Sequence, residues 1–271
     1  MKESAGRREF TLIAFLLLIA SVISGCSSSI QMQSALNENN IDVDGSRRDW
    51  GSSLNYVKDD NIAFGFKNDK DNLYIGLVTA DRSKMMKILT MGMTLWLKTD
   101  KSKIGIIFPM KPEPGEFREM RMNGEQDSSN ASSRIKNLIS ERRDIQVINE
   151  DDLPLYTEDA EKGPEFKGKL GYEDDQLVCE LKIPMRNNKL AERIFDESTD
   201  EVKINFVTGK FERNFRGGNM MGRNPGNPDN PGVGFPPGGG RNPGGMGRGR
   251  PRMEGMNFEP LDYTIDLKLS K

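Results

Sequence analysis

The side chains of this chain that could do chemistry are mostly carboxylates. Its 271 residues include no histidine, two cysteines and 41 aspartates and glutamates. Without histidine the chain cannot form a Ser-His-Asp or Cys-His nucleophile system. It also cannot form a His-ligated zinc or haem site. Carboxylate chemistry and the binding of hard cations such as calcium remain open.

The densest carboxylates lie near one polar turn, "NDKDN", which contains Asp69 and Asp71 and follows Asp59 and Asp60. Oxygen-rich loops can hold calcium, so Asp69 and Asp71 are calcium candidates. The competing interpretation is a solvated turn, because the spacing and the bidentate glutamate of a known calcium loop are missing. A glycosidase acid and base is a third interpretation, but nothing sets the separation of these carboxylates. We therefore expect no catalytic residue, no cofactor and a protein that is not an enzyme.

Trp96 is the candidate ligand-binding side chain. It shares one face of a predicted strand with Thr94 and Lys98, opposite an apolar stripe. An aromatic ring on a solvated face can stack against the apolar C–H face of a sugar. Tyr56 and Tyr74 are the aromatic residues that could assist it. The competing interpretation is that a helix or a long loop covers Trp96, since large apolar side chains are mostly buried.

The second tryptophan and the second cysteine are expected to be packing residues. Trp50 follows the turn signal Asp44-Gly45, where the chain enters a packed body. Cys179 lies on the apolar stripe of its predicted strand, so a buried, inert thiol is expected there.

The N-terminus is typical of an export signal. Lys2, Arg7 and Arg8 precede the apolar run 10–23, which is followed by small residues. A helix of fourteen residues spans about 21 Å, which is shorter than the roughly 30 Å hydrocarbon core of a bilayer. The pattern therefore predicts a secretory signal peptide over 1–25.

Cys26 ends the sequence "ISGC", which resembles the lipobox of bacterial lipoproteins. The resemblance implies a diacylglyceryl group on the thiol, cleavage before Cys26 and acylation of the new amino group. Three acyl chains would anchor the protein stably in a membrane of the cell envelope. Ser27, in place of aspartate, favours the outer membrane by the same resemblance. The alternative is an ordinary signal peptide with a cysteine nearby.

The remaining chain predicts one β-sandwich domain over 41–212 and 258–271, preceded by a flexible tether over 26–40. Alternating apolar residues mark several strands with one packed and one solvated face, as in antiparallel sheets. One or two short helices are expected, at 132–143 and 187–197. The predicted strands lie in the sequences "NIAFGFKND", "NLYIGLVTAD", "GMTLWLKTD", "KIGIIFP", "QLVCELKIP", "EVKINFVTG" and "LDYTIDLKLS".

Residues 213–257 are rich in glycine, proline and arginine and precede the last predicted strand. Such a composition cannot bury enough apolar surface to offset its ordering entropy, so we expect a long disordered loop. Its arginines could contact an anionic surface or an envelope protein, or the loop could be a spacer without a partner. The net charge of −2 and the scarcity of aromatic residues in the loop argue against specific nucleic-acid binding.

The sequences "IDVDGSRRDWG", "IAFGFKNDKDNLYIGLVTAD" and "GMTLWLKTD" together resemble the family 9 carbohydrate-binding-module-like domains of the DOMON superfamily. The resemblance covers about 42–110 and, more loosely, 170–209 and 259–270. It implies a β-sandwich that binds sugar between aromatic rings, with calcium in a structural role. The chain departs from the family's sugar binders because no evident carboxylate and amide set surrounds its tryptophans.

Together these features predict an exported, membrane-anchored, non-catalytic binding module whose candidate ligand is a carbohydrate. The alternative is an envelope interaction or scaffold protein that contacts its partner through the 213–257 loop.

Overall fold

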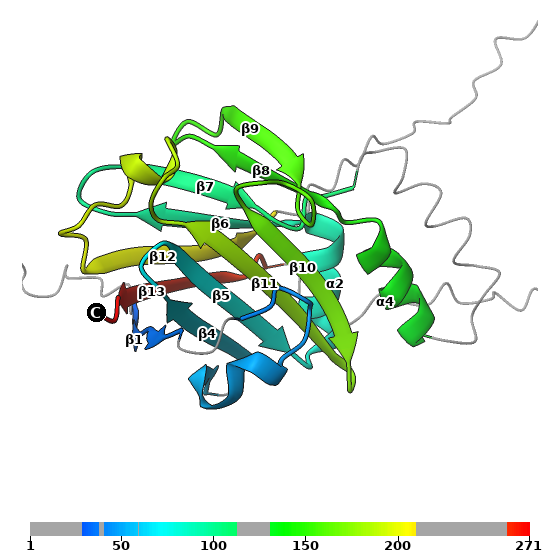
Figure 1. The fold of residues 1–271 in the computed structure, drawn as a ribbon. Helices are drawn as coiled ribbons and strands as arrows, with labels where there is room; N and C mark the ends of the chain where they lie inside the picture. The colour runs from blue at the N-terminus through cyan, green and yellow to red at the C-terminus, as the bar shows by residue number, and fades with distance from the viewer. Residues whose placement is uncertain (1–28, 38–40, 59, 113–130, 210–258) are drawn as a thin grey trace, which may run out of the picture. The chain divides into compact units, whose positions relative to one another are not determined.

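The chain forms a β-sandwich of two sheets in a computed structural model (Figure 1). The structure describes residues 29–37, 41–58, 60–112, 131–209 and 259–271. The predicted fold class, mainly β with few short helices, is confirmed. The expected signal peptide over 1–25, Cys26 and the 213–257 loop lie outside the described residues.

The larger sheet has seven strands in the order β1-β13-β12-β6-β7-β8-β9. Its pairs are antiparallel except β1 with β13, which is parallel. Its strands are β1 (Ile30–Gln33), β6 (Met93–Lys98), β7 (Lys103–Ile107), β8 (Asp144–Ile148), β9 (Pro154–Asp159), β12 (Glu201–Thr208) and β13 (Asp262–Lys268).

The smaller sheet has six strands, of which β10, β11, β5, β4 and β2 follow in order while β3 also pairs with β4. The β2–β4 pair is parallel and the others are antiparallel. Its strands are β2 (Ala35–Leu36), β3 (Leu54–Val57), β4 (Ile62–Asn68), β5 (Asn72–Thr79), β10 (Lys167–Glu173) and β11 (Gln176–Pro184).

The core lies between the two sheets and follows the predicted alternation. In β6, Met93, Leu95 and Leu97 are buried while Thr94 and Trp96 are only partly buried. Aromatic rings join the sheets across the core, with the centroids of Phe64 on β4 and Phe206 on β12 4.6 Å apart. Cys179 is a buried free thiol, as expected, and burial raises its pKa well above the usual value.

The expected tether over 26–40 is wrong for part of its length. Ile30–Gln33 pairs with β13 and Ala35–Leu36 pairs with β4. Ser34 between them is buried and donates a hydrogen bond to Asn68. The segment is short of bulky side chains, but its backbone completes the edges of both sheets, so the domain begins before residue 41.

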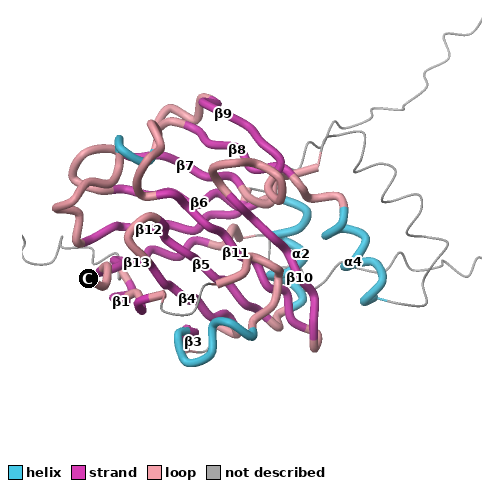
Figure 2. Tube along the Cα trace, in the orientation of Figure 1, coloured by secondary structure: helices cyan, strands magenta, loops and turns pink. Residues whose placement is uncertain are grey.

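Helices are few beside the strands (Figure 2). The helix α4 (Ala131–Ser140) confirms the first predicted helix, and the second is only a 3-10 turn, η2 (Ala191–Arg193). An unpredicted helix, α2 (Arg82–Met91), follows β5, and a 3-10 segment, η1 (Arg48–Ser53), precedes β3. None of the helices in the described part of the chain is long and apolar enough to cross a membrane.

Candidate functional site

Trp96 lies on the outer face of the seven-stranded sheet, near its middle. Its cross-strand partners are Asn205 on β12 and Gly105 on β7. The side chain is partly exposed, as the predicted alternation of β6 requires. The helices have their main contacts elsewhere, since α2 contacts β5 and β12 and α4 contacts β10. Among the described residues, Trp96 is therefore partly accessible from this face.

Gly105 lets the Trp96 indole pack directly against the backbone of β7. A Cβ atom at Gly105 would lie 3.0 Å from the Trp96 ring and 2.6 Å from the Ile148 side chain. The missing side chain lets Trp96 and Ile148 meet above β7, and it explains why Ile148 is buried although it points outward. The indole therefore lies against β7, with the aliphatic side chain of Ile148 at its edge.

Lys103 contacts the face of this ring. Its Nζ lies 4.0 Å from the centroid of Trp96. A cation over an exposed indole is worth about 0.5–1 kcal/mol. Within the described residues, the contact on the Trp96 ring is therefore a flexible side chain.

Polar side chains lie beside the Trp96 indole on β12 and β13. Asn205 donates hydrogen bonds from Nδ2 to Asp262 Oδ1 at 2.6 Å and to Thr264 Oγ1 at 3.1 Å. These three residues are held in one cross-strand network next to Trp96. We define the Trp96 face as Trp96, Lys103, Asn205, Asp262 and Thr264. No local sequence pattern indicates Asn205, Asp262 and Thr264 as site residues, because strand pairing brings them there.

The structure does not place Tyr56 and Tyr74 with Trp96. Both lie on the outer face of the other sheet, across the thickness of the sandwich. Tyr74 is buried and donates a hydrogen bond from its hydroxyl to Asp69 at 3.0 Å. Burial, with that carboxylate, raises the pKa of Tyr74 to about 12. Tyr56 is 68% exposed. A single ligand on the Trp96 face cannot contact either tyrosine.

Trp50 is the predicted packing anchor, and it lies flat on the outer face of the six-stranded sheet. Cβ atoms at Gly65 and Gly76 would lie 2.5 and 2.7 Å from its ring, so only glycine fits beneath it. The indole is 1% exposed. Its Nε1 donates to Glu180 Oε1 at 2.6 Å, and the Gly45 backbone donates to Glu180 Oε2 at 2.6 Å.

Glu180 is a buried carboxyl that sequence analysis missed. It lies on the polar stripe of β11, where exposure was expected, but Trp50 and the chain around Gly45 cover it completely. Burial raises the pKa of Glu180 to about 7, against the lowering effect of the two N–H donors. Because it is enclosed, it is a structural group and not an accessible acid.

The calcium candidates Asp69 and Asp71 lie in the turn between β4 and β5, and Asp69 is hydrogen-bonded within that turn. Asp69 Oδ1 accepts hydrogen bonds from the backbone N–H groups of Asp71 and Asn72 at 2.8 and 2.7 Å. Burial acts to raise the pKa of Asp69, but these bonds outweigh it and lower the pKa. Within the described ranges, no group of three or more acidic or cysteine side chains could hold a metal ion. The solvated-turn interpretation accounts for the contacts of Asp69.

Comparison with known proteins gives distant structural likenesses. No protein-family model and no curated protein matches the chain. A family 9 carbohydrate-binding module from Caldicellulosiruptor kristjanssonii in complex with glucose is 10% identical with a TM-score of 0.31, over 66% of this chain and 77% of that one. The same organism's module in complex with cellotriose is 11% identical with a TM-score of 0.31, over 67% and 76%. At this TM-score the likeness carries no argument about the ligand, which must be inferred from the chain's own residues.

Proposed function

We propose that this protein is an exported, lipid-anchored, non-catalytic module that binds carbohydrate on the Trp96 face. The observation that supports the proposal is the partly exposed indole of Trp96 on the outer sheet face, beside the hydrogen-bonded group of Asn205, Asp262 and Thr264. Sugars present an apolar C–H face and a rim of hydroxyl groups. An aromatic platform beside amide, carboxylate and hydroxyl groups matches both.

Sugar binding on this face requires Lys103 to leave the indole. The cation–π contact costs about 0.5–1 kcal/mol to break at an exposed site. Stacking a pyranose ring on the indole buries apolar area on both partners and offsets that loss, at roughly 25 cal/mol per Å². Once displaced, the Lys103 ammonium can donate to a ligand hydroxyl, since it keeps three N–H donors. The expected affinity is modest, because the site is a face and not an enclosed pocket.

The test is a titration of the purified protein with β-glucan and xylan oligosaccharides, followed by tryptophan fluorescence. We expect a saturable change in emission, because Trp96 is one of only two tryptophans and Trp50 is 1% exposed. Trp96→Ala should abolish the change while leaving the fold intact. Lys103→Met removes both the competing cation and one donor to the ligand, so it should change the affinity less than Trp96→Ala does. A response that persists in Trp96→Ala, or none across a broad glycan set, would contradict the proposal.

The anchoring part of the proposal rests on the sequence at Cys26. We expect a palmitate analogue fed to the producing cells to label the protein, and the intact mass to lack residues 1–25. Cys26→Ser should remove the label and release the protein from the membrane fraction. Ala131→Ser, a matched small change within the domain, should leave the labelling unchanged. Labelling that survives Cys26→Ser would place the lipid elsewhere and contradict this part.

A further inference from the structure

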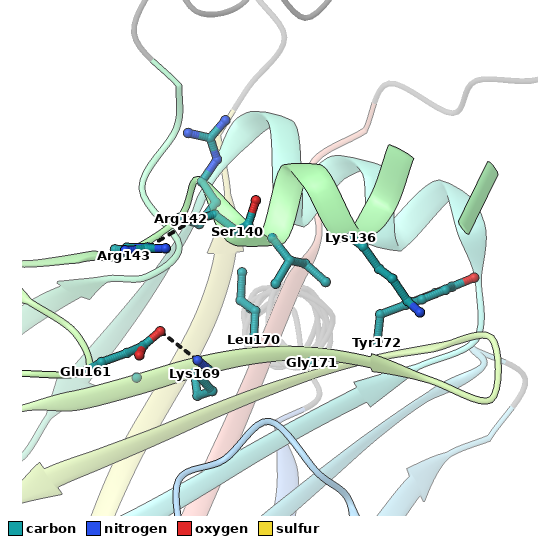
Figure 3. A pocket seen from close by; sticks show the side chains of 11 residues that line it. Lys136, Ser140, Arg142, Arg143, Glu161, Lys169, Leu170, Gly171 and Tyr172 are labelled. Carbon is teal, nitrogen blue, oxygen red and sulfur yellow. Dashed lines mark hydrogen bonds and ion pairs between the residues drawn. The ribbon is translucent and has the colours of Figure 1, made fainter. Parts of the chain in front are cut away.

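A hollow of about 290 Å³ lies between α4 and the edge strand β10, away from the Trp96 face (Figure 3). From α4, Lys136, Ile139 and Ser140 line one wall, since residues three and four apart share a helix face. Gly168 to Tyr172 of β10 line the other wall, with Glu161 and Arg143 at one end. The volume is slightly below the usual range of ligand pockets, about 300–1,000 Å³, and suits one sugar ring.

The charged side chains of this groove are mainly cationic. Lys136 and Arg143 are exposed and Lys169 is partly exposed, against one lining carboxylate, Glu161. Lys169 Nζ and Glu161 Oε1 form an ion pair at 2.6 Å, which leaves two cations in excess. Arg142 also lines the hollow but turns away from β10, and it is engaged with other groups. The chain as a whole has a net charge of −2, so the excess is local to the groove.

The cations occupy both ends of the groove. Figure 3 shows Lys136 beside Tyr172 at one end and Arg143 with Lys169 at the other, with Leu170 between them. Arg143 Nε donates to the Ser140 carbonyl at 3.2 Å and its charge also acts on Asp159. These contacts leave guanidinium N–H groups for a ligand, since arginine has five donors.

Apolar groups line the groove between its cations. Leu170 is buried, and Ile139 and Tyr172 are partly buried. The Tyr172 hydroxyl donates to Asp175 Oδ1 at 2.9 Å, which fixes the ring. A small inorganic anion would use the cations but not this apolar surface. A ligand that uses both needs an apolar face and a negative charge on one compact ring.

We propose that the groove between α4 and β10 binds an acidic sugar, a single pyranose ring that carries a carboxylate or a sulfate. Arg143 binds the oxyanion, since charged groups pair well with carboxylate and sulfate oxygens. Lys136, at the other end, donates to a ring hydroxyl. Tyr172, Leu170 and Ile139 contact the C–H face of the ring. Glu161 accepts from a ring hydroxyl. This site is separate from the Trp96 face, and it goes beyond the function proposed above.

The test is isothermal titration calorimetry of the full chain with digalacturonate, with galactose 6-sulfate and with the neutral galactobiose. We expect at least one acidic sugar to bind at least tenfold more tightly than galactobiose, and the difference to shrink in 1 M salt. The variant Lys136→Gln/Arg143→Gln should lose this binding by tenfold or more. Lys189→Gln removes an exposed charge in the turn after β11 and should bind like the unchanged protein.

Three outcomes of this titration would overturn the proposal. Equal binding of galactobiose would mean that the charge is not recognised, and equally tight binding of inorganic sulfate would mean that the sugar ring is not. Preference for anionic lipid vesicles over both acidic sugars would assign the groove to a membrane surface. Trp96→Ala should leave acidic-sugar binding unchanged, so failure here and failure of the Trp96 face are distinguished.

Discussion

Replacing Trp50 by alanine should lower the free energy of unfolding by about 3–5 kcal/mol, the usual loss for a large buried aromatic residue. The indole is 1% exposed and fills the space above Gly65 and Gly76, so its removal opens a cavity. It also leaves the buried Glu180 without its Nε1 donor. Denaturant unfolding followed by circular dichroism measures the loss.

Two variants separate the contributions to this loss. Trp50→Phe keeps a ring above the glycines but removes the N–H donor, so it should cost about 1–3 kcal/mol. Trp96 is partly exposed on the outer face of the seven-stranded sheet. Trp96→Ala should therefore lower the free energy of unfolding much less than Trp50→Ala does. A loss under 1 kcal/mol for Trp50→Ala would show that the indole does not pack as described.

Glu180 should make the protein less stable as the pH rises from about 4.5 to about 7. Burial raises its pKa to about 7 in the folded chain from a usual 4.5. Folded Glu180 therefore holds its proton where the unfolded chain has released it, and stability falls with pH between the two values. The full change is roughly 3 kcal/mol, since one pKa unit is worth about 1.4 kcal/mol.

The measurement is the free energy of unfolding between pH 5 and pH 8 for the unchanged protein and for Glu180→Gln. The glutamine accepts from Trp50 but cannot ionise, so most of the fall with pH should disappear. Asp60 and Asp69, whose pKa values are lowered, act in the opposite direction but only at lower pH. The same slope in both proteins over this range would contradict the assignment.

The sandwich could be predicted because its central strands carry their own pattern. β6, β11 and β12 alternate apolar and polar residues, and their inward residues are buried; in β6 and β12 the outward residues are more exposed. β1 and β2 could not be predicted, because their place depends on parallel pairing with strands far along the chain. The edge strands β9 and β10, and β8 beside β9, were not predicted either. β9 is mostly exposed, so its residues carry no apolar stripe.

The helix α2 had a signal that was overlooked. Asp81 accepts hydrogen bonds from the backbone N–H groups of Ser83 and Lys84 and caps its first turn. Met85, Ile88 and Leu89 follow at helical spacing and are buried. The aspartate before this apolar spacing could have predicted the helix.

The candidate sites also combine features that one strand's pattern predicts with features that depend on long-range contacts. Trp96 could be placed on an outer face from the alternation of one strand. Its separation from Tyr56 and Tyr74 depends on which sheet each strand joins, and no local pattern encodes that. The burial of Glu180 depends on Trp50, 130 residues away in the chain. The groove between α4 and β10 likewise combines residues from two segments that local patterns cannot bring together.

The most direct test of glycan binding at the Trp96 face is a two-dimensional ¹⁵N–¹H spectrum that resolves the two indole N–H groups. Trp96→Ala assigns the peaks by removing one of them. Addition of a bound oligosaccharide should shift the Trp96 peak and leave the Trp50 peak in place, because Trp50 is enclosed and bonded to Glu180. A Trp96 peak that stays fixed at millimolar concentrations of every oligosaccharide tested would contradict the account.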